Sequence, residues 1–135
     1  MSLAALPLTI IPFVLYNIVL LSGIGLGTSL VGSGIPMMSG GTWVLTIGDL
    51  LLLVTMVTLF IEIVKATYTG TASMIDHGLS MLVFIACLMQ FLMVKDAATS
   101  VFFLITIACL IDVIAGFTIG IRVAKRDIGL GGGDA

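Results

Sequence analysis

The sequence predicts an all-α integral membrane protein, a compact antiparallel bundle of four transmembrane helices. Composition and spacing carry this prediction. Of 135 residues, 60% are hydrophobic and only 9% are charged, and the mean hydropathy is +1.34, whereas a soluble domain has roughly 25% charged residues. Four apolar stretches also come close to the roughly 20 residues that a helix needs to cross the hydrocarbon core of a membrane.

The same composition excludes several classes of function. Five Lys and Arg residues do not make the basic surface that a nucleic acid requires, so no nucleic-acid partner is expected. Two cysteines do not make a disulfide framework. With one histidine and no metal-binding or catalytic motif, the chain is predicted not to be an enzyme and to hold neither a metal nor a cofactor.

Segments with helix breakers or charges separate the four predicted spans, which cover residues 8–31, 43–61, 76–94 and 100–121. In the first span, Pro7 and Pro12 fall in or near the opening turn, where a missing N–H is tolerated. Residues 1–128 are expected to form one domain. The glycine-rich residues 129–135 are expected to form a flexible tail.

Each later span ends at residues typical of a membrane interface. The second begins at Trp43 and ends before Glu62. The third, the shortest apolar stretch, needs the residues up to His77 to span fully and ends before Lys95. The fourth ends before Arg122. Since backbone polar groups inside a bilayer must be satisfied within each helix, a four-helix bundle is the expected architecture.

The placement of Lys and Arg predicts the orientation. With four spans, both termini and the middle loop share one side of the membrane, and that side collects Lys65, Arg122, Lys125 and Arg126, while the other side has Lys95. The positive-inside rule then places both termini in the cytoplasm of a multi-pass protein, expected in a bacterial inner membrane. Membrane lipids are expected partners, and the bases at 122, 125 and 126 suit their headgroups.

Asp112 lies near the middle of the fourth span, where a charged Asp costs roughly 2.5–3.5 kcal/mol. It belongs to a row of mostly small residues that recurs every four positions and includes a GxxxG pattern, which lets another helix approach closely. Two glycines in the first span suggest a similar close approach. Helix–helix contacts are therefore predicted at Ala108, Asp112, Gly116, Gly120, Gly23 and Gly27.

The polar residues expected inside the membrane are Asn17, Asp49, Gln90 and Asp112. Asp49 and Gln90 lie at similar depth, so a hydrogen bond between them is expected. The alternative is that Asp49 and Asp112 mark two positions on one cation path. At the depth of Asp112, the candidate partners are Asn17, Thr55 and Cys87.

Two functions fit these features. The first is a non-catalytic accessory or assembly subunit that docks in the membrane plane, as a homo-oligomer or in a larger complex, because short loops leave little surface for a soluble partner. The alternative is a small oligomeric proton- or cation-coupled transporter or channel that uses Asp112 and Asp49. Four spans in a chain of this length resemble the small multidrug resistance transporters, whose acidic residue in the first helix is replaced here by Asn17.

Overall fold

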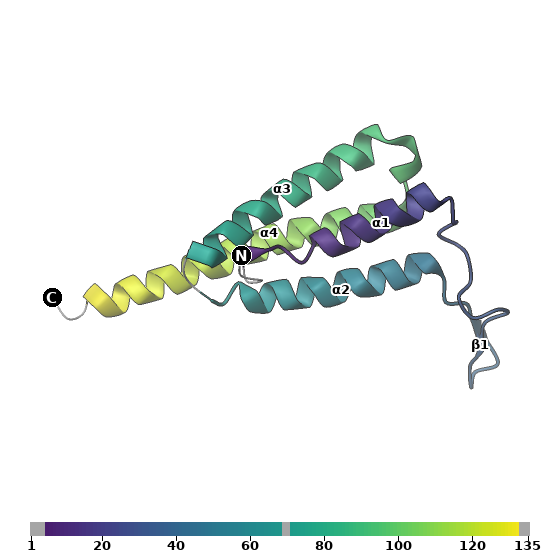
Figure 1. The fold of residues 1–135 in the computed structure, drawn as a ribbon. Helices are drawn as coiled ribbons and strands as arrows, with labels where there is room; N and C mark the ends of the chain where they lie inside the picture. The colour runs from purple at the N-terminus through teal and green to yellow at the C-terminus, as the bar shows by residue number, and fades with distance from the viewer. Residues whose placement is uncertain (1–4, 69–70, 133–135) are drawn as a thin grey trace.

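The chain folds into an antiparallel helical bundle, described by a computed structural model for residues 5–68 and 71–132. The helices are α1 (Ile10–Ser22), α2 (Ile47–Lys65), α3 (Thr71–Met93) and α4 (Ser100–Gly132), with a short 3-10 helix, η2 (Lys95–Ala97), between the last two. Consecutive helices run in opposite directions in an elongated bundle (Figure 1). The predicted all-α class is confirmed.

Three of the helices are long and apolar enough to cross a membrane. They are α2, the Ser73–Met93 part of α3 and the Ser100–Arg122 part of α4. The apolar helix α1 has 13 residues, and at about 1.5 Å per residue it covers roughly 20 Å of a hydrocarbon core about 30 Å thick. The bundle therefore combines three helices of membrane-spanning length with one shorter apolar helix.

The first helix ends much earlier than the predicted span of residues 8–31. It stops at Ser22 because Gly23 adopts φ +78°, the left-handed conformation that closes many helices. Two further glycines, Gly25 and Gly27, follow within a turn and disfavour a new helix. A Cβ added at Gly23 or Gly27 would meet no atom within 4 Å. Neither glycine therefore lies at a close helix–helix contact, contrary to the prediction.

Residues 23–46 form a loop that carries a small β-hairpin beyond one end of the bundle (Figure 1). Its strands, β1 (Ile35–Pro36) and β2 (Thr42–Trp43), pair antiparallel, with Ile35 opposite Trp43. The apolar residues after Gly23 therefore belong to a loop. Hydropathy alone does not distinguish such a loop from the second half of a helix.

The second helix begins at Ile47 because Thr46 and Asp49 form a capping box. Thr46 Oγ1 accepts the Asp49 N–H, and Asp49 Oδ2 accepts the Thr46 N–H, both at 3.1 Å. The helix then continues to Lys65, so it is shifted along the chain from the predicted span of residues 43–61. Asp49 lies exposed in the first helical turn of α2, at the start of a helix long and apolar enough to cross a membrane.

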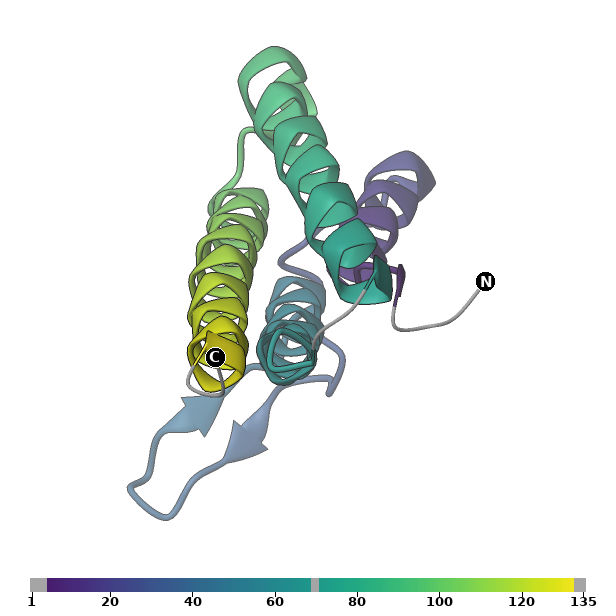
Figure 2. The same ribbon diagram turned by 90° about the vertical axis from the view of Figure 1, so that its left-hand side faces the viewer.

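The fourth helix packs most extensively against α3 and α2, and Figure 2, which looks along the helices, shows both beside it. It continues to Gly132, past the predicted end at residue 121, and its final turns project beyond the other helices (Figure 1). The predicted flexible tail of residues 129–135 is thus helical up to Gly132. Residues 133–135 lie outside the described part of the chain.

An apolar core fills the middle of the bundle. The rings of Tyr16 and Phe102, which are both fully buried, lie 4.6 Å apart between centroids. Around them, the other buried core residues are Leu51, Val83, Cys87, Ala97, Ile105 and Cys109. This core separates two polar regions, one at each end of the bundle.

Candidate functional site

A cluster of ionisable side chains is buried at the end of the bundle where α2 ends and α3 begins. Glu62 and Asp76 are each 1% exposed, Asp112 is 2% exposed, and the Lys65 side chain is 14% exposed. A buried charge is costly unless it is paired and hydrogen-bonded. Three carboxyl groups here face one ammonium group, so the cluster contains more acid than base.

The ammonium group of Lys65 is the centre of the hydrogen bonds in this cluster. It donates to Glu62 Oε1 at 2.8 Å, to Asp76 Oδ1 at 3.0 Å and to the Leu6 carbonyl oxygen at 2.6 Å. These three acceptors use all three of its N–H groups. Lys65 thereby joins α2, α3 and the segment that precedes α1.

The segment before α1 covers the cluster. Glu62 Oε1 also accepts the backbone N–H of Leu8 at 2.7 Å. Leu8 comes just before the helix, where backbone N–H groups lack intrahelical partners, so the carboxylate satisfies a donor that would otherwise need water. Ala5 and Thr9 are buried in the same segment.

Asp112 enters the cluster from the face of α4 that carries Ala108, Gly116 and Gly120. This face packs against α3: a Cβ at Gly116 would lie 2.7 Å from Nδ1 of His77, and one at Gly120 would lie 3.9 Å from Nε2. Ala108 is buried as well. The row of small residues therefore serves a helix contact within the chain and brings Asp112 into the bundle.

The neighbours of Asp112 come from α3 and α2. Ser80 of α3 lies next to its carboxyl group, and the charges of Glu62 and Lys65, in the last turn of α2, act on it. The sequence placed Glu62 and Lys65 at the membrane rim. The shift of α2 along the chain moves Glu62 into the bundle instead.

The residues proposed as partners of Asp112 are engaged elsewhere. Asn17 and Gln90 form two reciprocal hydrogen bonds, at 3.2 Å and 2.7 Å. Gln90 therefore pairs with Asn17, which corrects the predicted bond to Asp49. The cause is the position of Asp49 at the N-terminus of α2, where it caps the helix.

Thr55 and Cys87 are also occupied by other contacts. Thr55 Oγ1 donates to the Leu51 carbonyl oxygen in its own helix at 2.7 Å. Cys87 Sγ lies 3.8 Å from Cys109 Sγ, and both thiols are buried between α3 and α4. Among the described hydrogen bonds, those of Thr55 and Cys87 go to these groups and not to Asp112, the partner that the depth comparison suggested.

Four buried oxygen atoms make no hydrogen bond with any described residue: Thr9 Oγ1, Glu62 Oε2, Ser80 Oγ and Asp112 Oδ2. They come from the N-cap of α1, from α2, from α3 and from α4 respectively. Buried polar groups in native proteins nearly always have partners, so unpartnered ones indicate a bound water or ion. Across residues 5–68 and 71–132, no three His, Cys, Asp or Glu side chains gather as a metal site.

His77 borders the cluster. Its Nδ1 atom lies 3.9 Å from Asp76 Oδ2, and its Nε2 atom lies 3.5 Å from Ser73 Oγ. The ring also contacts the Phe117 ring, with centroids 5.8 Å apart. His77 is therefore held between α3 and α4 by contacts on several sides.

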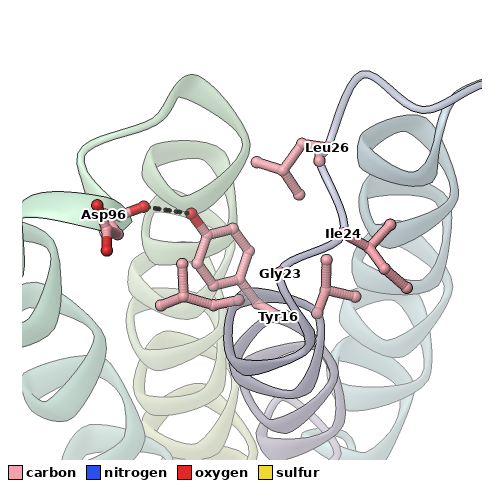
Figure 3. A pocket seen from close by; sticks show the side chains of 8 residues that line it. Tyr16, Gly23, Ile24, Leu26 and Asp96 are labelled. Carbon is pink, nitrogen blue, oxygen red and sulfur yellow. Dashed lines mark hydrogen bonds between the residues drawn. The ribbon is translucent and has the colours of Figure 1, made fainter.

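A pocket of about 300 Å³ lies at the opposite end of the bundle (Figure 3). Tyr16 lines it, and its hydroxyl group lies 2.8 Å from Thr99 Oγ1 and 3.4 Å from the Asp96 carbonyl oxygen. The remaining lining residues are Val19, Leu20, Gly23, Ile24, Gly25, Leu26 and Asp96. The apolar core separates this pocket from the charged cluster.

The three bases predicted to meet lipid headgroups lie at and just after the end of the spanning part of α4. Arg122, Lys125 and Arg126 are all exposed. They lie at the same end as the charged cluster. This arrangement suits contact with anionic headgroups.

Glu62, Lys65 and Asp76 are the site residues that the sequence did not single out. Their signal was present: Glu62 and Lys65 are three residues apart, so they share a helix face. Asp76 follows on the next antiparallel helix, which begins at the same end of the bundle. Opposite charges at the adjoining ends of consecutive spans can therefore indicate a buried pair.

The chain matches no protein-family model, no curated protein and no solved structure.

Proposed function

We propose that the chain is a small ion-coupled membrane transporter or channel, working as an oligomer, in which the cluster around Asp112 takes up the coupling ion. The observation that carries this proposal is the excess of buried carboxyl groups over Lys65. An intramembrane ionisable residue that faces the bundle interior typically marks an ion pathway or a proton relay. The cluster can take up positive charge as protons or as a small cation.

The proposed topology has four crossings and both termini in the cytoplasm of a bacterial inner membrane. In this topology α1 and part of the loop that follows it make the first crossing. Lys65, Arg122, Lys125 and Arg126 lie on the cytoplasmic side, in agreement with the positive-inside rule. The charged cluster then lies at the cytoplasmic end of the bundle, beneath the segment before α1.

The depths of the cluster residues support an entry path from that side. Lys65 ends α2 and Asp76 lies near the start of the apolar part of α3, whereas Asp112 lies near the middle of the apolar part of α4. Glu62 is one helical turn deeper than Lys65. These groups form a series from the rim to mid-depth, and the core around Phe102 closes the path beyond it in this conformation.

Reconstituted liposomes test the proposal. With an imposed proton or sodium gradient, we expect flux through vesicles that contain the native chain and a loss of flux in Asp112→Asn. The matched control is Asp49→Asn, because Asp49 is exposed and Asn keeps an oxygen that can accept the Thr46 N–H. Equal flux in native and Asp112→Asn vesicles would contradict the proposal.

A second candidate function is a non-catalytic accessory subunit that docks in the membrane plane against itself or a larger complex. The observation in its favour is that the end of α4 projects past the bundle (Figure 1). Arg122, Lys125 and Arg126 are exposed near this end of the helix. Extraction in mild detergent tests it. This function predicts a stoichiometric membrane partner or a defined homo-oligomer that Asp112→Asn leaves intact.

A further inference from the structure

We infer that the buried cluster contains a binding site for a small monovalent cation of the size of Na⁺, with one oxygen ligand from each of the four helical segments. The ligands are Thr9 Oγ1, Glu62 Oε2, Ser80 Oγ and Asp112 Oδ2. The inference rests on the proposed function, because it names the coupling ion of the same site.

The first argument is that these atoms lack hydrogen bonds although water cannot reach them freely. Thr9, Glu62 and Ser80 are each 1% exposed, and Asp112 is 2% exposed. Within the described residues, they are the buried side-chain oxygen and nitrogen atoms that have no partner. Leaving a buried polar atom unsatisfied costs about 1–3 kcal/mol, and more if it is charged, so the carboxylate oxygen atoms Glu62 Oε2 and Asp112 Oδ2 in particular indicate a bound species.

The second argument is that the four residues are neighbours. His77 of α3 lies against Gly116 of α4, and because these helices are antiparallel, Ser80, three residues after His77, lies level with Asp112, four residues before Gly116. Thr9 follows Leu8, whose N–H bonds Glu62 Oε1. Thr9, Glu62, Ser80 and Asp112 therefore belong to one part of the bundle, where the segment before α1 meets α2, α3 and α4.

The third argument is the chemistry of the ligands. All four atoms are oxygen, which suits hard cations and not the soft metals that prefer sulfur or imidazole. Lys65 already places one positive charge against Glu62 and Asp76. It repels a divalent cation about twice as strongly as a monovalent one, so the site favours a monovalent ion. Glu62 and Asp76 both bond Lys65, whereas Asp112 makes no ion pair with a described residue, so its carboxylate supplies charge for the cation.

Thermal unfolding of the purified full chain in detergent, with salt varied at constant pH and ionic strength, tests the site. A ligand that binds the folded state raises Tm as its concentration increases. We expect NaCl to raise Tm to a plateau when it replaces choline chloride, and radiolabelled Na⁺ to bind with one saturable site per chain. Equal Tm values in both salts, together with no saturable Na⁺ binding, would overturn the inference.

The informative variant is Ser80→Ala, which removes a neutral ligand and no charge. We expect the apparent Na⁺ affinity to fall about tenfold, the effect of an interaction worth about 1.4 kcal/mol. Thr9→Ala should act in the same direction. Asp49→Asn is the matched control and should leave the affinity unchanged, since that side chain lies at the N-terminus of α2. Unchanged affinity in both alanine variants would overturn the ligand assignment.

The two proposals can fail separately. Asp112-dependent proton flux without Na⁺ binding would overturn the cation site and leave ion-coupled transport in place. Na⁺ binding that Ser80→Ala weakens, in a chain that conducts no ion, would support the cation site and contradict transport.

Discussion

The imidazole ring of His77 lies against Gly116, where an added Cβ would come within 2.7 Å of Nδ1 and 2.9 Å of Cε1. The ring has little freedom to move aside, because it is 7% exposed and also contacts Phe117. We therefore expect Gly116→Ala to destabilise the α3–α4 contact by about 1–3 kcal/mol, as overpacking does in other cores. Chemical denaturation in detergent measures this change.

Gly120→Ala is the matched control, because a Cβ there would lie 3.9 Å from His77 Nε2, an ordinary contact distance. Both variants make the same chemical change in the same helix, so helix propensity cancels in the comparison. Equal stability of the two variants would show that His77 does not pack on Gly116.

Lys65 is the single ammonium group in the described cluster, and its removal should be costly. Lys65→Met leaves Glu62 and Asp76 buried without their cation, and breaking a buried ion pair on one side typically destabilises a protein by about 3–5 kcal/mol. The expected result is a large fall in Tm and release of the segment before α1, which Lys65 holds through Leu6. Limited proteolysis near the N-terminus measures that release.

Lys95→Met provides the comparison for this prediction. Lys95 is exposed in η2 at the opposite end of the bundle. Its replacement changes the net charge by the same amount and should alter stability by less than about 0.5 kcal/mol. If both lysine variants were equally stable, the proposed role of Lys65 in holding the cluster together would be wrong.

The paired amides of Asn17 and Gln90 join α1 to α3. Asn17→Leu should destabilise the bundle by about 0.6–1.7 kcal/mol, the range measured for polar contacts between membrane helices. The double variant with Gln90→Leu should recover part of this loss, because it removes the amide left without a partner. A double-mutant cycle measures the coupling, and strictly additive effects would contradict the pairing.

The bounds of a helix could be predicted from the sequence where the helix covers the same residues as one apolar stretch. This holds for α3 and the spanning part of α4, whose ends lie close to the predicted ones. It fails at α1 because the residues after Gly23 are apolar but not helical. There the ability of glycine to adopt a left-handed backbone conformation ends the helix. A count of apolar residues does not take this ability into account.

Only part of the candidate site could be predicted in the same way. Asp112 was evident because a lone acid in an apolar stretch is unusual. Glu62 and Asp76 could not be recognised as site residues in this way, because charged residues are common at the ends of membrane spans. Glu62 is covered by the segment before α1, whose Leu8 N–H it accepts although the two residues are 54 positions apart in sequence. No local pattern records such a contact.

The left-handed conformation of Gly23 provides a test of where the first helix ends. Its φ of +78° is strained for any residue with a Cβ, at a cost of roughly 1–2 kcal/mol. Gly23→Ala should therefore lower Tm or extend α1 into the following loop, while Gly27→Ala, which has open space and no positive φ, should change little. Backbone chemical shifts of residues 23–31 distinguish the two responses. Helical shifts throughout this segment in the native chain would show that the helix continues past Ser22.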